Sequence, residues 1–142
     1  MQTHFSPAAI FSGIRSLATV LVAALAVGLA GCSAADAQDS VSLDFARAEH
    51  ESGRAVLIDI REPFEHATGI AKNVQLLPMQ QLGNRLAEIP KDPGKPVLLI
   101  CNTQNRSGAT LAALKKAGYT NVKFVQGGMS EWNRRGWPTV RP

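Results

Sequence analysis

The sequence predicts one α/β domain built on a parallel or mostly parallel sheet with helices on both faces. Segments that are apolar almost throughout, at 55–60, 96–100 and 122–125, alternate with segments of helical periodicity. Strands buried on both faces form continuous apolar runs, and their alternation with helices is typical of βαβ units. Ligands bind at the carboxyl ends of such strands, where Cys101 directly follows the run 96–100.

The first half of this domain is expected to contain a helix, a buried strand and a short second helix. Ser42 is a suitable N-cap for a helix over 44–51, whose inward positions are expected to be Phe45, Ala46 and Ala48. The run A-V-L-I-D-I at 55–60 predicts the strand, and Pro63 suits the first turn of the helix that follows.

The second half is expected to continue the alternation. An apolar piece at 74–77 ends at Pro78, and Leu82, Leu86 and Ile89 mark one face of a helix. The remaining predicted elements are strands at 96–100 and 122–125 and helices at 106–117 and 130–134. Gly118 is suited to end the longer helix, and Gly127-Gly128 predicts a tight turn close to the segment after Cys101.

The first 31 residues are predicted to be a lipoprotein signal peptide. The apolar run 17–29 is shorter than the roughly 20 residues that span a membrane. It ends in L-A-G-C, which resembles the bacterial lipobox, where the chain is cut before a cysteine that then carries lipid. We therefore expect a signal at 1–31, a lipidated Cys32, a tether at 32–40 and a domain at 41–142.

This organisation predicts an exported protein that faces the periplasm and is anchored in a bacterial membrane through lipid. Ser33 resembles the sorting pattern for the outer rather than the inner membrane. An ordinary signal peptide, cut near Ala37, is the alternative.

Lipid on Cys32 would leave Cys101 without a disulfide partner, since the chain has two cysteines. An unpaired exported thiol is either buried and inert or kept for its reactivity. The formal net charge is +4, with scattered basic residues and few aromatics, which argues against a nucleic-acid partner. His50 and His66 lack further ligands at a useful spacing, so no metal site is expected.

The segment C-N-T-Q-N-R-S-G, which begins at Cys101, carries the chemistry. Its middle residues have to curl between a strand and a helix, so backbone N–H groups converge into a concavity that binds anions. This setting, together with the guanidinium of Arg106, favours a thiolate. The sequence predicts a nucleophilic Cys101 beside an anion- or substrate-binding loop of Asn102, Thr103, Gln104, Asn105, Arg106 and Ser107. Phosphoryl transfer and sulfur transfer both use such a site.

Three motifs in order resemble the rhodanese-like sulfurtransferases. The active-site loop of that family has four residues between cysteine and arginine, as here, whereas the related cysteine phosphatases have five. The segment I-D-I-R-E-P-F-E at 58–65 resembles the family pattern D-x-R-E-x-x-E, and G-G-M-S-E-W-N-R-R-G-W-P-T-V at 127–140 resembles its closing motif. One departure is G-I-A-K-N-V, where the family has G-H-I-x-G-A: Ile70 replaces the histidine and Asn73 the second glycine.

The resemblance implies a five-stranded parallel sheet and a sulfurtransferase that works through a persulfide on Cys101, with no cofactor. Asp59 and Arg61 are expected to be structural and to pin the end of a strand to a neighbouring loop. The expected partners are a small sulfur-containing substrate, such as thiosulfate or a persulfide, and an envelope protein as a possible acceptor. A persulfide carrier or redox sensor without turnover is the main alternative, and a cysteine phosphatase or arsenate reductase is a further one.

Overall fold

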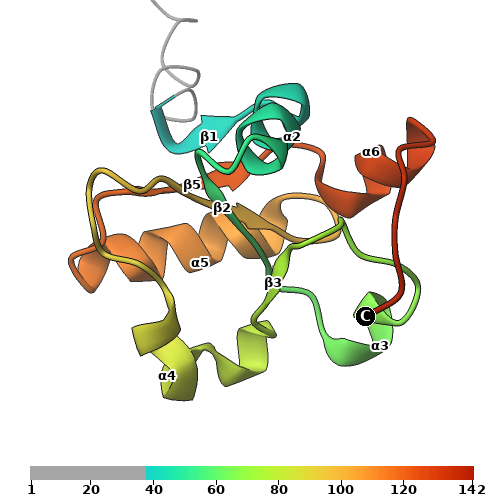
Figure 1. Cartoon of the computed structure of the whole chain (residues 1–142). Helices are drawn as coiled ribbons and strands as arrows, with labels where there is room; N and C mark the ends of the chain where they lie inside the picture. The colour runs from blue at the N-terminus through green and yellow to red at the C-terminus, as the bar shows by residue number, and fades with distance from the viewer. Residues whose placement is uncertain (1–37) are drawn as a thin grey trace, which may run out of the picture. The chain divides into compact units, whose positions relative to one another are not determined.

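A five-stranded, all-parallel sheet forms the centre of residues 38–142, the part of the chain that the computed structural model describes (Figure 1). The strand order is β1-β5-β4-β2-β3. The strands are β1 (Ser40–Val41), β2 (Val56–Asp59), β3 (Gln75–Leu76), β4 (Val97–Ile100) and β5 (Val122–Val125). The predicted α/β class and parallel sheet are confirmed, whereas the expected signal peptide and Cys32 lie outside the described residues.

Side chains alternate between the two faces of the sheet, and helices cover each face (Figure 1). One face packs against α2 (Leu43–Glu51) and α6 (Gly128–Arg134) through Leu57, Leu98 and Ile100. The other face packs against α5 (Asn105–Lys116) through Ile58, Val97, Leu99 and Cys101. Cys101 therefore belongs to the α5 side of the core.

Helix α2 begins as predicted but turns a different face inward. The Ser42 hydroxyl accepts a hydrogen bond from the Phe45 amide at 3.2 Å, so the expected N-cap is confirmed. Leu43 and Ala46 are buried, whereas Phe45 is 50% exposed and Ala48 is also exposed. The prediction that Phe45 and Ala48 point inward is wrong. Phe45 lies two positions after buried Leu43 and Ala48 two positions after buried Ala46, and two positions turn a side chain by about 200° around the helix.

The predicted helix around Leu82 is broken into short pieces. They are the 3₁₀ turns η1 (Met79–Gln81) and η2 (Leu86–Glu88), with the four-residue α4 (Leu82–Arg85) between them. Gly83 disfavours a helix interior by about 1 kcal/mol, and Pro90 forces the residue before it into extended backbone. Leu82 and Leu86 nevertheless pack against the core beside buried Ile89.

Ile70 and Asn73, the two departures from the family pattern, lie in a segment that still forms a turn, at residues 72–73. Asn73 has φ 60°, a left-handed conformation that asparagine tolerates better than most residues, so it can stand where the family has glycine. Ile70 is buried and forms an antiparallel bridge with Val140 near the end of the chain. Among residues 38–142, no helix is both long and apolar enough to cross a membrane.

Candidate active site

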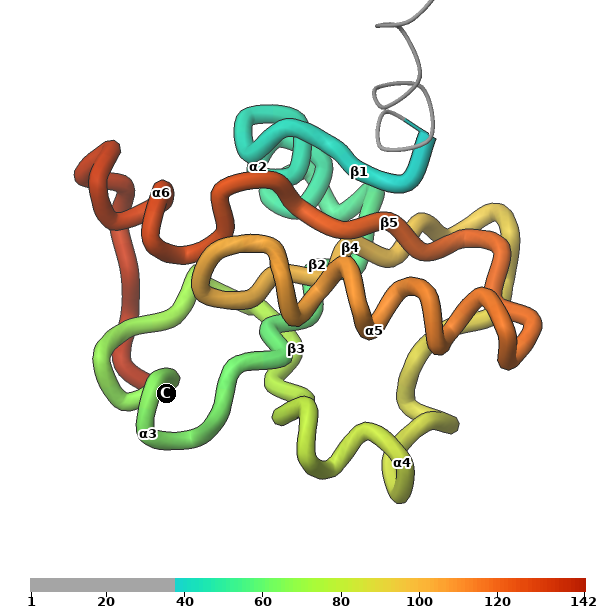
Figure 2. The backbone as a smooth tube through the Cα atoms, turned by 180° about the vertical axis from the view of Figure 1, so that it is seen from behind, coloured from blue at the N-terminus to red at the C-terminus, as the bar shows by residue number. Residues whose placement is uncertain are grey.

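The carboxyl ends of two adjacent strands bring the motifs of the sequence together. Asp59 pairs with Ile100 in the register of β2 and β4, and the Ile60 amide donates to the Ile100 carbonyl at 2.9 Å. The helix α3 (Pro63–His66) starts just after β2. Figures 1 and 2 show the segment that joins β4 to α5 lying between α3 and α6. Parallel sheets bind ligands at this position, outside the carboxyl ends of neighbouring strands.

Cys101 lies at the base of this segment, fully buried at 0% exposure. Its sulfur is 3.5 Å from the Ser107 hydroxyl oxygen, which comes from the first turn of α5. That hydroxyl donates its proton to the Gln104 carbonyl at 3.0 Å, so a neutral thiol is the donor in the contact with Ser107. Rotation of the hydroxyl would let it donate to a thiolate instead.

Helix α6 orients the backbone of the loop. The amides of Met129 and Ser130 donate to the carbonyls of Cys101 and Asn102, each at 2.8 Å. Gly127 and Gly128 have φ values of 77° and 61°, which produce the tight turn that the sequence predicted. Within residues 38–142, the backbone N–H groups of 102–107 donate to no other group of the chain. They are the donors that an anionic sulfur or oxygen would need.

Two loop side chains fasten the loop to the start of α6. The Asn102 side-chain oxygen accepts from the Ser130 hydroxyl at 3.1 Å, and the Gln104 side-chain oxygen accepts from the Gly127 amide at 3.0 Å. Thr103 and Asn105 are exposed. The predicted anion-binding loop thus presents backbone more than side chains to its interior.

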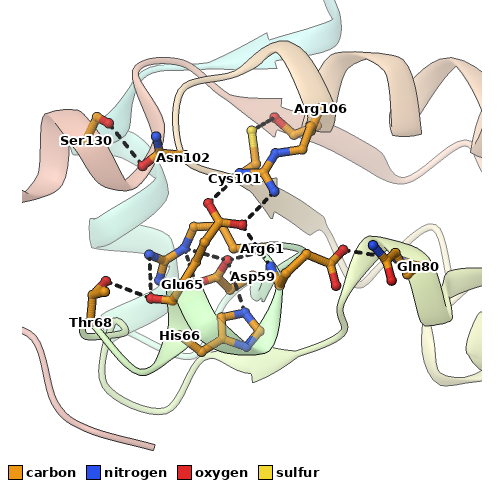
Figure 3. Close-up of polar contacts among 12 residues, drawn as sticks. Asp59, Arg61, Glu65, His66, Thr68, Gln80, Cys101, Asn102, Arg106 and Ser130 are labelled. Atoms are coloured by element: carbon orange, nitrogen blue, oxygen red, sulfur yellow. Dashed lines mark hydrogen bonds and ion pairs between the residues drawn. The ribbon is translucent and has the colours of Figure 1, made fainter.

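Arg106 is paired with a residue that the sequence analysis did not single out. Its two terminal nitrogens donate to the two Glu65 carboxylate oxygens at 2.7 and 2.6 Å, and Figure 3 shows the two side chains pointing toward one another. The hydrogen bonds from Arg106 lower the pKa of Glu65 to about 2. The same bonds raise the pKa of Arg106, with smaller contributions from the charges of Cys101 and Glu62. Both groups are therefore ionised at neutral pH.

A second ion pair, Asp59 with Arg61, supports the site at the end of β2. The two side chains are almost fully buried, and the Arg61 guanidinium donates to Asp59 at 2.7 and 3.0 Å. It also donates to the Gly69 carbonyl at 2.8 Å and to the Glu65 carbonyl at 3.3 Å. These contacts tie the end of β2 to α3 and to the segment that follows it.

His66 lies beside this pair without a fixed partner for its Nε2. That nitrogen is 3.5 Å from an Asp59 oxygen and makes no hydrogen bond. In the described part of the chain, no cluster of three or more histidine, cysteine, aspartate or glutamate side chains is arranged to hold a metal ion.

The comparison with known proteins identifies the family. Residues 42–135 match the sequence model of the rhodanese-like domain. The chain is a member of this family. A sulfurtransferase of Allochromatium vinosum is 38% identical over 104 residues, which cover 73% of this chain and 94% of that protein. A probable adenylyltransferase/sulfurtransferase, MoeZ, of Mycobacterium tuberculosis is 37% identical over 63% of this chain, but the match covers only 23% of that protein.

Solved structures of rhodanese-like proteins have the same architecture. A rhodanese-related protein from Thermoplasma volcanium superposes with a TM-score of 0.64 at 28% identity, and the match covers 72% of this chain and 98% of that one. A thiosulfate sulfurtransferase from Pseudomonas aeruginosa also gives a TM-score of 0.64, at 24% identity over 74% of this chain and 20% of that one. The second likeness supports the rhodanese-like fold alone.

Proposed function

We propose that this protein is a sulfurtransferase that moves a sulfane sulfur from thiosulfate or a persulfide to a thiophilic acceptor through a persulfide on Cys101. The observation that carries the proposal is the position of the Cys101 sulfur at the end of β4, at the base of a loop whose amides at 102–107 bond to no described part of the chain. Membership of the rhodanese-like family, with relatives named as sulfurtransferases, supports the same reaction.

The proposed cycle is a double displacement without net oxidation. The Cys101 thiolate attacks the outer sulfur of the donor and forms a new S–S bond. The S–S bond of the donor breaks, and its electron pair leaves with sulfite or with the donor thiolate. An acceptor thiolate or cyanide then attacks the outer sulfur of the Cys101 persulfide, which restores the Cys101 thiolate. The loop amides stabilise the anionic sulfur in both steps.

Mass measurement of the intact protein tests the proposal. The protein is incubated with thiosulfate or with glutathione persulfide, weighed, and then mixed with cyanide. We expect a gain of one sulfur atom at Cys101 from at least one donor and the loss of that sulfur to cyanide. A Cys101→Ser protein should do neither. Equal sulfur transfer by Cys101→Ser and the unchanged protein would refute the proposal.

The complete burial of Cys101 favours a second candidate, a persulfide carrier that releases its sulfur only to a specific protein in the cell envelope. This carrier would load sulfur on Cys101 but would turn over slowly with cyanide and small thiols. Steady-state turnover with these acceptors separates the two: many cycles per minute indicate an enzyme, and a stable persulfide that survives excess small thiol indicates a carrier.

We further propose that the protein is exported and anchored by lipid on Cys32. The L-A-G-C sequence is the basis of this proposal. In bacterial cells, the unchanged chain should fractionate with membranes. A Cys32→Ala chain should lose that association, and its persistence in the membrane fraction would contradict the anchor.

A further inference from the structure

Arg106 is the cation of the loop, but both terminal nitrogens of its guanidinium group already donate hydrogen bonds within the protein. Both terminal nitrogens bond to Glu65 at 2.7 and 2.6 Å, in the paired geometry that is the strongest an arginine makes with a carboxylate. An anion that needs these nitrogens has to compete with a carboxylate of the protein itself.

Glu65 is held in place from a second direction. The same carboxylate accepts a hydrogen bond from the Glu62 amide at 3.0 Å at the start of α3. The Glu65 side chain is 17% exposed and that of Arg106 is 30% exposed, so water screens the pair only in part. The carboxylate is therefore a fixed part of the site and not a surface group that happens to reach it.

The charges around Cys101 do not favour a doubly charged donor. Arg61 is saturated by buried Asp59, and Arg106 is paired with Glu65. Each of the two guanidinium groups therefore already faces a carboxylate of the protein. The backbone amides of 102–107 can still hold one anionic sulfur, but they carry only partial charge.

We propose that Glu65 determines the donor class by neutralising Arg106, so that the site discriminates against dianions such as thiosulfate and accepts organic persulfides of low net charge. This inference rests on the proposed sulfur transfer and refines it. Thiosulfate would have to displace Glu65 or place its two charges beside that carboxylate. A persulfide presents one charged sulfur to the loop amides and leaves as a thiolate, without needing the Arg106 fork.

The test compares the full chain with its Glu65→Gln variant. The glutamine is nearly the same size, and its remaining oxygen can still accept from the Glu62 amide, while the charge that occupies Arg106 is removed. Donors are thiosulfate and cysteamine persulfide, whose ammonium group offsets the persulfide charge, with cyanide as the common acceptor. Glu88→Gln, which removes the carboxylate of an exposed pair with Arg85, is the matched control.

We expect Glu65→Gln to raise kcat/KM for thiosulfate about tenfold, chiefly through KM, and to change that for cysteamine persulfide by less than about twofold. Glu88→Gln should leave both values unchanged. Adding Arg106→Gln to Glu65→Gln should abolish the gain, because the gain requires a freed guanidinium. An unchanged donor ratio in folded Glu65→Gln, or a gain that persists without Arg106, would overturn the inference.

Sulfate provides a readout that does not depend on turnover, since it is a dianion without transferable sulfur. It should protect Cys101 from alkylation at about tenfold lower concentration in Glu65→Gln than in the unchanged chain. Equal protection in the two proteins would also overturn the inference.

Failure of both donors to load sulfur on Cys101 of the unchanged chain would instead refute the proposed function, while the sulfate comparison would still decide the role of Glu65. If Glu65→Gln unfolds, Glu65→Asp, which keeps the charge but shortens its reach, should show a smaller gain in the same direction, and no gain would count against the inference.

Discussion

A Cβ atom on Gly128 would lie 2.5 Å from the carbonyl oxygen of Cys101. It would also lie 2.6 Å from the Asn102 oxygen and 2.4 Å from the Thr103 oxygen. With φ at 61°, Gly128 also has a backbone conformation that costs other residues energy. We predict that Gly128→Ala lowers the free energy of unfolding by about 3 kcal/mol or more and reduces sulfur transfer. Urea unfolding and the cyanide assay measure the two effects.

Gly83→Ala is the control for that substitution. Gly83 lies in α4, and an added Cβ would meet no atom within 4 Å. Alanine there should stabilise the protein by up to about 1 kcal/mol and leave activity intact. Equal stability of the Gly128→Ala protein and the unchanged protein would show that the turn tolerates a side chain and that the close approach is not required.

Asp59→Asn tests the buried ion pair. The substitution leaves the Arg61 guanidinium buried without its counter-charge, which should lower the free energy of unfolding by about 3–5 kcal/mol. Glu51→Gln removes the carboxylate of the more exposed Arg47–Glu51 pair and should change stability by less than about 0.5 kcal/mol. Similar small effects in both variants would mean that Arg61 is satisfied by the carbonyls of Gly69 and Glu65 alone.

The Glu65–Arg106 pair predicts an acid-dependent loss of stability. The pKa of Glu65 is lowered from 4.5 to about 2 by hydrogen bonds from Arg106, so folding favours the ionised form. The stabilisation is complete above the unfolded pKa and is lost as the pH falls through the range from 4.5 to about 2. The difference in unfolding free energy between the unchanged chain and Glu65→Gln should be constant from about pH 6 to 8 and shrink below about pH 4.5. A difference that does not change down to pH 2 would contradict the pairing.

Ser107→Ala tests the hydroxyl beside the nucleophile. Loss of a hydroxyl 3.5 Å from the sulfur, which can rotate to donate to the thiolate, should slow alkylation of Cys101 by iodoacetamide about three- to tenfold at pH 7. Ser130→Ala, a substitution in α6 that removes the hydroxyl bonded to the Asn102 side chain, should react like the unchanged chain. Identical alkylation rates for Ser107→Ala and the unchanged chain would show that the Ser107 hydroxyl does not affect the reactivity of Cys101.

The sheet was predictable because its central strands are buried on both faces and form apolar runs that polar segments interrupt. Strand β5 has the predicted bounds of 122–125. Strand β1 was not predictable, because two residues that pair with Phe124 and Val125 leave no periodic pattern. The continuous helix expected around Leu82 does not form. The spacing of its apolar residues is helical, but Gly83 and Pro90 disfavour helical backbone there.

The position of Cys101 at the end of a strand could be predicted from the apolar run 96–100 that precedes it. The ion pair of Glu65 with Arg106 beside it could not. Glu65 is distant from Arg106 in the sequence and meets it only because β2 and β4 are neighbours. A signal was present in Pro63, which starts a helix directly after β2 and so keeps Glu65 near the carboxyl end of that strand. An ion pair between loops of adjacent strands requires the strand order, and the sequence alone does not give it.

The bridge between Ile70 and Val140 makes the segment around Val140 a part of the support for Cys101. Ile70 is adjacent to Gly69, whose carbonyl accepts from Arg61, and a Cβ on Gly69 would lie 2.9 Å from the Thr139 hydroxyl. During synthesis on the ribosome, Cys101 therefore emerges well before the residues that complete its surroundings. Until Thr139 and Val140 have been added to the chain, the segment that supports the site lacks its contacts at Gly69 and Ile70.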